Sequence, residues 1–158
     1  MGLTDTIVAS ATLTVIVEEK CLVGKVDRGS KTTLTIAGIT DMYTRIVGVP
    51  TAGTGLAEFD TNPGSGVFKT TMKYLRITNK DATNFVTLTF ANHATDNSAD
   101  HLYSTKLEAG KSFMLGSTAF AASVDDADHM LATGEVIKEI KAQADTAACD
   151  VEIVIGEG

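Results

Sequence analysis

Residues 74–90 read YLRITNKDATNFVTLTF, and this stretch decides the class of fold. Apolar residues recur at every second position on both sides of the tip NKDATN, starting at Leu75 and again at Val86. A period of two is typical of strands with one dry face. Asn and Asp suit the tip because they tolerate left-handed backbone and bond their own main chain. The sequence therefore predicts a β-hairpin over residues 73–91 with a loop of five or six residues.

The same alternation recurs along the rest of the chain. It is clearest in ATLTVIVEE (11–19) and DVEIVI (150–155), and a second hairpin is predicted over 101–115 with its turn at 108–111. Threonine occurs 23 times, and β-branched residues favour strands because their side chains lose rotamer freedom in helices. Further strand candidates are 32–38, 42–49, 55–60 and 66–71.

The segment GEVIKEIKAQADTAA (134–148) fits two readings. Val136, Ile137, Ile140 and Ala144 lie at helical spacing, and the Glu, Lys, Gln and Ala content slightly favours a helix. As a strand, Val136, Ile140, Ala142 and Ala144 share one face, with one break at Lys138. We favour the strand, because the predicted strand that follows needs a partner in a sheet.

These elements together predict an all-β fold. Nine to eleven short strands separated by turns are typical of a two-layer antiparallel β-sandwich or jelly roll. A chain of 158 residues is most simply one domain, 1–158, with residues 1–10 as a candidate extended arm. The loops 92–100 and 116–133 are polar or rich in small residues. Edge strands in such folds need cover, and a partner subunit is one way to provide it.

Charge and hydropathy argue against two classes of partner. The net charge is −7 with a pI near 4.8, and no Lys/Arg cluster that would locally reverse this sign stands out, so nucleic acid is a poor partner. Apolar runs are far shorter than the roughly 20 residues of a membrane-spanning helix, so no membrane is expected.

The chain has two cysteines, Cys21 and Cys149. Cys149 shares a face with apolar neighbours and is read as a small buried hydrophobe. Nothing indicates that it pairs with Cys21, although a disulfide between them stays open.

Metal and catalytic motifs are weak. The run Asp125-Asp126-Ala127-Asp128-His129 offers oxygen and imidazole ligands, but it lacks the glycine and the spacing of a calcium loop, and it also describes any solvated loop. His93, His101 and His129 are isolated from one another, without the His-x-His pair of a cupin metal site. Gly64-Ser65-Gly66 is not the Gly-x-Ser-x-Gly nucleophile elbow, and it reads as a turn.

Sugar binding has little support either. Aromatic residues make up 6% of the chain and tryptophan is missing, whereas sugar platforms are usually aromatic. Tyr74 and Tyr103 are candidates for exposed faces, but lone exposed tyrosines are common. We therefore predict no catalytic, metal-binding or cofactor-binding residue, no cofactor, and a protein that is not an enzyme.

Three segments carry a resemblance to a known class of protein. They are KYLRITNKDATNFVTLTF (73–90), KLEAGKSFML (106–115) with TAF just after it, and IKAQADTAACDVEIVIG (140–156). Together they resemble segments of small virion structural proteins of tailed bacteriophages. The likeness covers roughly residues 72–156, with weaker echoes in TLTIAGI and YTRIVGVP. It concerns whole segments and contains no catalytic signature.

The resemblance implies an all-β subunit present in many copies in a virus particle, with 136–144 as a strand. The first expectation is a capsid decoration, or cement, protein that bridges capsomers on the head surface, after synthesis in the host cytoplasm. Its partners would be the major capsid protein or other virion proteins and further copies of itself, with a homotrimer favoured because trimers suit local three-fold positions. Alternatives are a neck, tail or fibre-base component, a carbohydrate-binding β-sandwich module, and a metal-dependent jelly-roll enzyme.

Overall fold

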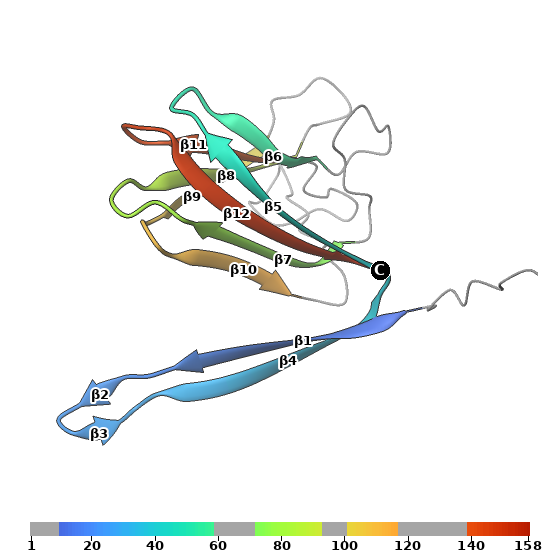
Figure 1. Cartoon of the computed structure of the whole chain (residues 1–158), viewed down its shortest axis with the longest axis vertical. Helices are drawn as coiled ribbons and strands as arrows, with labels where there is room; N and C mark the ends of the chain where they lie inside the picture. The colour runs from blue at the N-terminus through green and yellow to red at the C-terminus, as the bar shows by residue number, and fades with distance from the viewer. Residues whose placement is uncertain (1–9, 59–71, 93–100, 117–138) are drawn as a thin grey trace, which may run out of the picture.

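The computed structural model describes residues 10–58, 72–92, 101–116 and 139–158. These residues form twelve strands and no helix. Two four-stranded antiparallel sheets pack against each other, and a long two-stranded ribbon projects from them (Figure 1). The predicted two-layer antiparallel β-sandwich is therefore confirmed. The described strands exceed the expected nine to eleven because the tip of the ribbon contains two strands of only two residues.

Each sheet interleaves strands that lie far apart in the sequence. The first sheet has the order β10 (Ser112–Gly116), β7 (Met72–Asn79), β12 (Cys149–Glu157) and β5 (Asp41–Val49). The second sheet has the order β6 (Thr54–Glu58), β11 (Glu139–Ala144), β8 (Val86–Asn92) and β9 (His101–Leu107). All of these pairings are antiparallel.

The core lies between the two sheets and follows from the alternation in the sequence. In β12, Val151, Ile153 and Ile155 are buried, whereas Asp150 is exposed on the opposite side of the strand. Fully burying one such aliphatic side chain contributes about 1.5–3 kcal/mol. The other buried members of this core are Val49, Leu56, Ala57, Met72, Leu75, Ile77, Val86, Leu88, Phe90, Leu107, Ile140, Ala142, Ala144 and Cys149.

Residues 73–91 do not form the predicted hairpin. β7 pairs with β10 and β12, whereas β8 pairs with β11 and β9, so residues 80–85 cross from one sheet to the other. Alternation shows which face of a strand is buried, but it does not identify the neighbouring strand. Packed sheets lie about 10 Å apart, a distance that a six-residue loop spans easily. The two strands were predicted correctly and their pairing was wrong.

The second predicted hairpin, over 101–115, is wrong for the same reason. β9 and β10 are consecutive strands, but they belong to different sheets. The predicted turn at 108–111 is a connection between layers, closed by a hydrogen bond from the Lys111 amide to the Glu108 carbonyl (3.1 Å). The two loops therefore both join the layers of the sandwich (Figure 1).

The strand reading of 134–148 is confirmed for Glu139–Ala144, which is β11. Its buried face contains Ile140, Ala142 and Ala144, as the strand pattern predicted. The expected neighbour is wrong, because β11 pairs with β6 and β8 while β12 lies in the other sheet. Residues 134–138 lie outside the described residues.

The remaining strand predictions divide into two groups. The strands at 11–19, 32–38, 42–49 and 150–155 are confirmed, and the one at 55–60 is confirmed as far as residue 58. The candidate at 66–71 lies outside the described residues, as do residues 93–100 and 117–133 of the two long loops. Within the part of the chain that the structure describes, no helix is long and apolar enough to span a membrane.

A projecting ribbon was not predicted. β1 (Ala11–Glu19) pairs antiparallel with β4 (Ser30–Ile39), and the short β2 (Leu22–Val23) and β3 (Val26–Asp27) continue the ribbon to its tip. We call residues 11–39 the arm. The tip turns at Gly24 and Lys25, with φ values of 58° and 68°. Positive φ at both central residues is the type I′ geometry, which suits the twist of a two-residue hairpin.

Candidate docking surface

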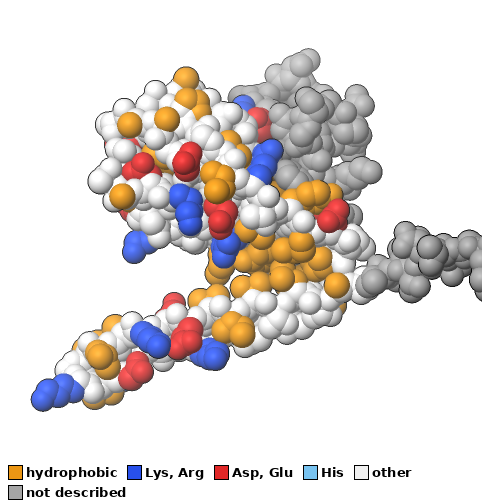
Figure 2. Space-filling model, viewed as in Figure 1, with side chains coloured by type: hydrophobic (Ala, Val, Ile, Leu, Met, Phe, Trp, Pro, Cys, Tyr) orange, Lys and Arg blue, Asp and Glu red, His pale blue; other side chains and the backbone are white. Residues whose placement is uncertain are grey.

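The arm is attached to the outer face of the first sheet, the face that points away from the second sheet. Ile36 and Ile39 of the arm pack on Tyr74 of β7 and Val154 of β12, and all four side chains are buried. Leu13 and Val15 pack against this cluster from β1. We call these six residues the arm root. It is a second, smaller apolar cluster, separate from the core of the sandwich (Figure 2).

Two glycines allow the arm to approach the sheet closely. A Cβ atom on Gly156 would lie 2.9 Å from the Met42 sulfur and 3.3 Å from Ile39 Cδ1. A Cβ atom on Gly116 would lie 3.4 Å from Ile36 Cδ1. The sheet therefore has no side chains at Gly116 and Gly156, where the arm root packs on it. Larger side chains at these positions would push the arm away from the sheet.

Polar contacts hold the base of the arm in place. The Lys73 ammonium donates hydrogen bonds to the carbonyls of Gly38 (3.0 Å) and Ala37 (3.3 Å). The Thr40 amide donates to the Glu157 carbonyl (2.7 Å), which links the end of the arm to the end of β12. The arm root is thus fixed both by apolar burial and by backbone hydrogen bonds.

Beyond the root the arm is exposed. Ile16 is 57% exposed and Leu22 is 77% exposed, and Val23 and Val26 at the tip are also exposed. Single exposed apolar residues are ordinary on protein surfaces, but several on one projecting element are typical of an interaction surface.

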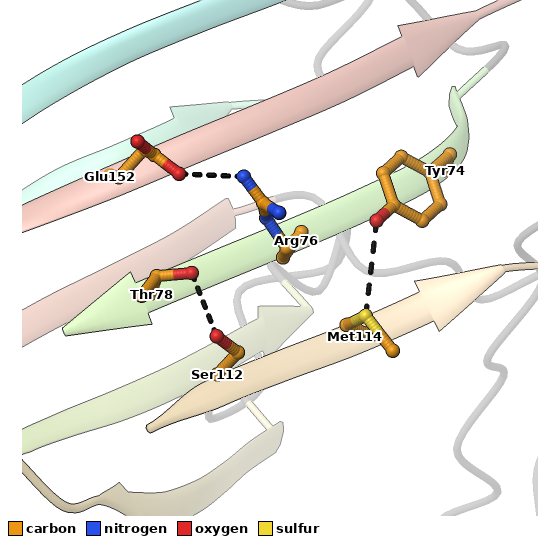
Figure 3. A network of polar contacts seen from close by, with 6 residues as sticks. All are labelled: Tyr74, Arg76, Thr78, Ser112, Met114 and Glu152. Carbon is orange, nitrogen blue, oxygen red and sulfur yellow. Dashed lines mark hydrogen bonds and ion pairs between the residues drawn. The ribbon is translucent and has the colours of Figure 1, made fainter. Parts of the chain in front are cut away.

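The outer face of the first sheet continues beyond the root as a mixed surface. Ile46 of β5 is 63% exposed, and Met42 and Met114 are also exposed. Between them the polar side chains contact one another (Figure 3). Arg76 forms an ion pair with Glu152 (2.6 Å), and Thr78 shares a hydrogen bond with Ser112 (2.8 Å).

Tyr74 connects this face to the arm root. Its hydroxyl contacts the Met114 sulfur at 3.8 Å (Figure 3). Desolvation under the arm raises the pKa of Tyr74, and the nearby Arg76 charge lowers it by less. Tyr74 is therefore buried and neutral, which corrects its reading as a candidate for an exposed face. Tyr103 is exposed, as expected, at the edge of the second sheet, 5.9 Å from the Phe90 ring centroid.

The candidate chemical groups of the sequence are not brought together within the described residues. His101 lies in β9, whereas His93, the run 125–129 and the turn 64–66 lie outside the described residues. No group of three or more His, Cys, Asp or Glu side chains that could hold a metal ion occurs in the described part of the chain. Cys149 is buried, as predicted, and Cys21 on the arm is exposed, so the two thiols are free.

The arm also carries a charge pattern that the sequence reading missed. Residues 20–31, around the tip, contain four cations and one carboxylate, a net charge of +3. The whole chain carries −7, so the other residues carry −10. Lys20 pairs with Glu18 of β1 (3.5 Å), and the whole arm, with Glu18, Glu19 and Asp27, carries +1. A signal for the arm was present, since two alternating runs flank the Gly24-Lys25 turn.

Comparison of this chain with protein-family models, with curated proteins and with solved structures finds no match.

Proposed function

We propose that this protein is a non-enzymatic structural component of a bacteriophage virion, and specifically a capsid decoration protein that stabilises the head shell by bridging capsomers. The observation that carries the proposal is the arm, with the outer sheet face beside it. Both present large apolar side chains to solvent on a compact sandwich, which is typical of a docking surface. The likeness of segments 73–90, 106–115 and 140–156 to virion proteins is the reason for proposing a virion as the assembly on which this surface docks.

The physical requirements of such a role match this architecture. A bridging subunit needs a rigid body and more than one surface for partners. The sandwich provides the body, since its core is closed between two sheets. Many copies on one shell add up to a large stabilisation of the shell even if each copy binds with modest affinity. Each standard interface buries roughly 1,200–2,000 Å², and it is repeated around the particle. The proposed partners are the major capsid protein and further copies of this chain, with a trimer favoured at local three-fold positions.

The test is reconstitution on particles that lack this protein. Purified protein added to such heads is expected to bind at saturation in hundreds of copies and to raise the temperature at which the heads release their DNA. A saturating number of six or twelve would instead assign it to the neck, tail or fibre base. Heads that bind none, together with its absence from purified virions, would contradict a virion role.

A further inference from the structure

A β-bulge interrupts the arm at its root. Thr12 pairs with Ala37, whereas the preceding Ala11 pairs with Ile39. Gly38 is therefore an extra residue on β4, inserted between two residues that face β1. Its φ is 73°, the left-handed conformation that glycine adopts at such bulges. Because a bulge bends its strand, the direction of the arm is set close to its root.

The bulge also explains how the arm root forms. Ile36 and Ile39 are three residues apart, and in a regular strand such side chains point to opposite faces. Both are nevertheless buried against Tyr74 and Val154. The extra residue Gly38 turns Ile39 to the face of Ile36, so the apolar contact of the arm depends on the bulge.

An ammonium group holds the bulge in place. Lys73 of β7 is half-buried, and its Nζ donates to the carbonyls of Gly38 (3.0 Å) and of the preceding Ala37 (3.3 Å). A Cβ atom on Gly38 would lie 2.6 Å from this Nζ. Glycine therefore provides both the positive φ and the room for the ammonium. We call Ala37, Gly38 and Lys73 the latch.

The arm is a separate element outside its root. Within the described residues, β1 and β4 form a sheet of their own, and no strand of the two larger sheets pairs with them. The chain passes from β4 to β5 at Thr40, whose amide donates to the Glu157 carbonyl (2.7 Å). The contact between the arm and the first sheet is therefore concentrated at the root and the latch.

The sandwich closes its core without the arm. None of the described arm residues belongs to the core cluster between the two sheets. At the end of the sandwich away from the arm root, neighbouring connections between the layers are joined by backbone hydrogen bonds (Figure 1). These bonds run from the amides of Asn79, Lys80 and Ala144 to the carbonyls of Lys111 (3.0 Å), Asp150 (2.8 Å) and Pro50 (3.2 Å), respectively. The sandwich is thus held together by contacts of its own.

We propose that the latch closes a hinge at Gly38, and that its opening releases the arm as one unit while the sandwich stays folded. Proteins open locally in cooperative units, and an element with few buried contacts opens at a lower free energy than the core. Opening exposes the face of the arm that carries Leu13, Val15, Ile36 and Ile39. The arm therefore has a closed position, which the structure shows, and an open one.

Hydrogen exchange of the full chain, followed by mass spectrometry, tests whether the arm opens separately. In the wild type, the amides of residues 34–39 should exchange faster than those of β12. Lys73→Met should accelerate exchange at 34–39 by about tenfold and leave β12 unchanged, because it removes two hydrogen bonds from a charged donor. Lys80→Met is the matched control, since Lys80 is an exposed lysine just after the same strand, and it should keep the wild-type rates.

Gly38→Ala tests the hinge itself. The new side chain is strained at positive φ and meets the Lys73 Nζ, so exchange at 34–39 should accelerate by a similar factor. The double variant Gly38→Ala/Lys73→Met should add little to either single variant, because both open the same latch. Gly24→Ala is the control: Gly24 also has a positive φ (58°), but it lies at the tip and a Cβ there meets nothing within 4 Å. Its rates at 34–39 should equal those of the wild type.

Fluorescence anisotropy provides a second readout of the open position. Cys21 is exposed and Cys149 is buried, so a maleimide dye labels the arm of the folded chain. Lys73→Met should lower the anisotropy of this dye, because a released arm reorients more freely, and Lys80→Met should not.

Several results would overturn the latch. They are equal exchange of 34–39 and β12 in the wild type, unchanged exchange at 34–39 in Lys73→Met, acceleration throughout the sandwich, and fully additive effects in the double variant. All of these measurements use the free chain. They therefore decide about the latch whether or not the protein joins a virus particle.

Discussion

Asn79 is a completely buried polar side chain at the point where β7 leaves the first sheet. Its Nδ2 donates to the carbonyls of Asn84 (2.8 Å) and Leu107 (3.2 Å), and its Oδ1 accepts from the Asp81 amide (3.0 Å). One side chain therefore fastens its own loop to the neighbouring connection between the layers. This explains why an amide stands in a strand whose other inward positions are aliphatic.

Replacement of Asn79 tests this role directly. Asn79→Leu keeps a similar volume but breaks one buried and two part-buried hydrogen bonds to backbone groups, which should lower the free energy of unfolding by about 3 kcal/mol. Urea denaturation measures the change. Thr146→Ala is the control, because it removes only an exposed hydrogen bond to Asn84, and it should cost less than about 1 kcal/mol. A loss for Asn79→Leu no larger than that of the control would refute the role.

Asp81 makes the same loop sensitive to pH. Its carboxylate accepts hydrogen bonds from the amides of Asn84 (2.6 Å) and Thr83 (2.8 Å), and these bonds lower its pKa in the folded chain. A lowered folded pKa means that the stabilisation is complete above the unfolded pKa of about 3.9 and is lost as pH falls through the folded value.

The Asp81 prediction concerns the slope of stability against pH. The urea midpoint of the wild type should fall between about pH 5 and pH 2 more steeply than that of Asp81→Asn. The amide keeps an acceptor oxygen but does not titrate in this range. Parallel slopes for the two proteins would show that the Asp81 carboxylate makes no contribution.

The fold shields the Cys149 thiol from solvent and from reagents. Burial raises its pKa, and the nearby charges of Asp81, Asp145 and Asp150 raise it further. In the variant Cys21→Ser, the remaining thiol should react with a disulfide reagent at pH 8 only as the chain unfolds, because both access and thiolate formation are suppressed. Rapid reaction of the native variant would contradict its burial.

At the scale of elements, the contact between the arm and the first sheet depends on a position without a side chain, Gly156. Gly156→Val should destabilise the protein by about 1–3 kcal/mol, because the new side chain meets Met42 and Ile39 at less than van der Waals distance. Gly48→Ala is the control in the same sheet, since the nearest atom to its new Cβ, the Asp150 carboxylate oxygen, is 3.9 Å away.

Two readouts separate loosening of the arm from general destabilisation. The thermal midpoint should fall in Gly156→Val and stay near the wild-type value in Gly48→Ala. Limited proteolysis at the lysines of the arm should accelerate in Gly156→Val below its thermal midpoint. An unchanged cleavage rate there would show that the arm root does not depend on this close approach.

The elements also show how far alternation in a sequence can be interpreted. It located β1, β4, β5, β7, β8, β11 and β12 and the buried face of the central strands, because burial of one face is a local property of a strand. It did not identify partners, since pairing depends on how the layers fold over each other. Both predicted hairpins failed for that reason at loops 80–85 and 108–111.

The docking surface was the least predictable part. Tyr74 alternates with buried residues and so was placed on an exposed face, but the arm returns over that face and buries it. Likewise, Ile39 and Gly156 meet only because residues far apart in the chain converge on β12. Such tertiary contacts leave no mark in the local pattern of either segment.

At the scale of the whole molecule, the buried apolar side chains of the described residues form two separate clusters. One closes the sandwich, and the other fixes an arm whose distal part faces solvent. Residues 20–31 at the tip carry a net charge of +3, although the whole chain carries −7. A sandwich with one projecting ribbon that carries exposed apolar side chains fits the proposed docking role.

Electron cryomicroscopy of purified virions tests this account most directly. We expect density for the eight-stranded sandwich at the seams between capsomers, with each arm in contact with a neighbouring protein of the shell. Virions without this density, or copies whose arms extend into solvent and touch nothing, would contradict it.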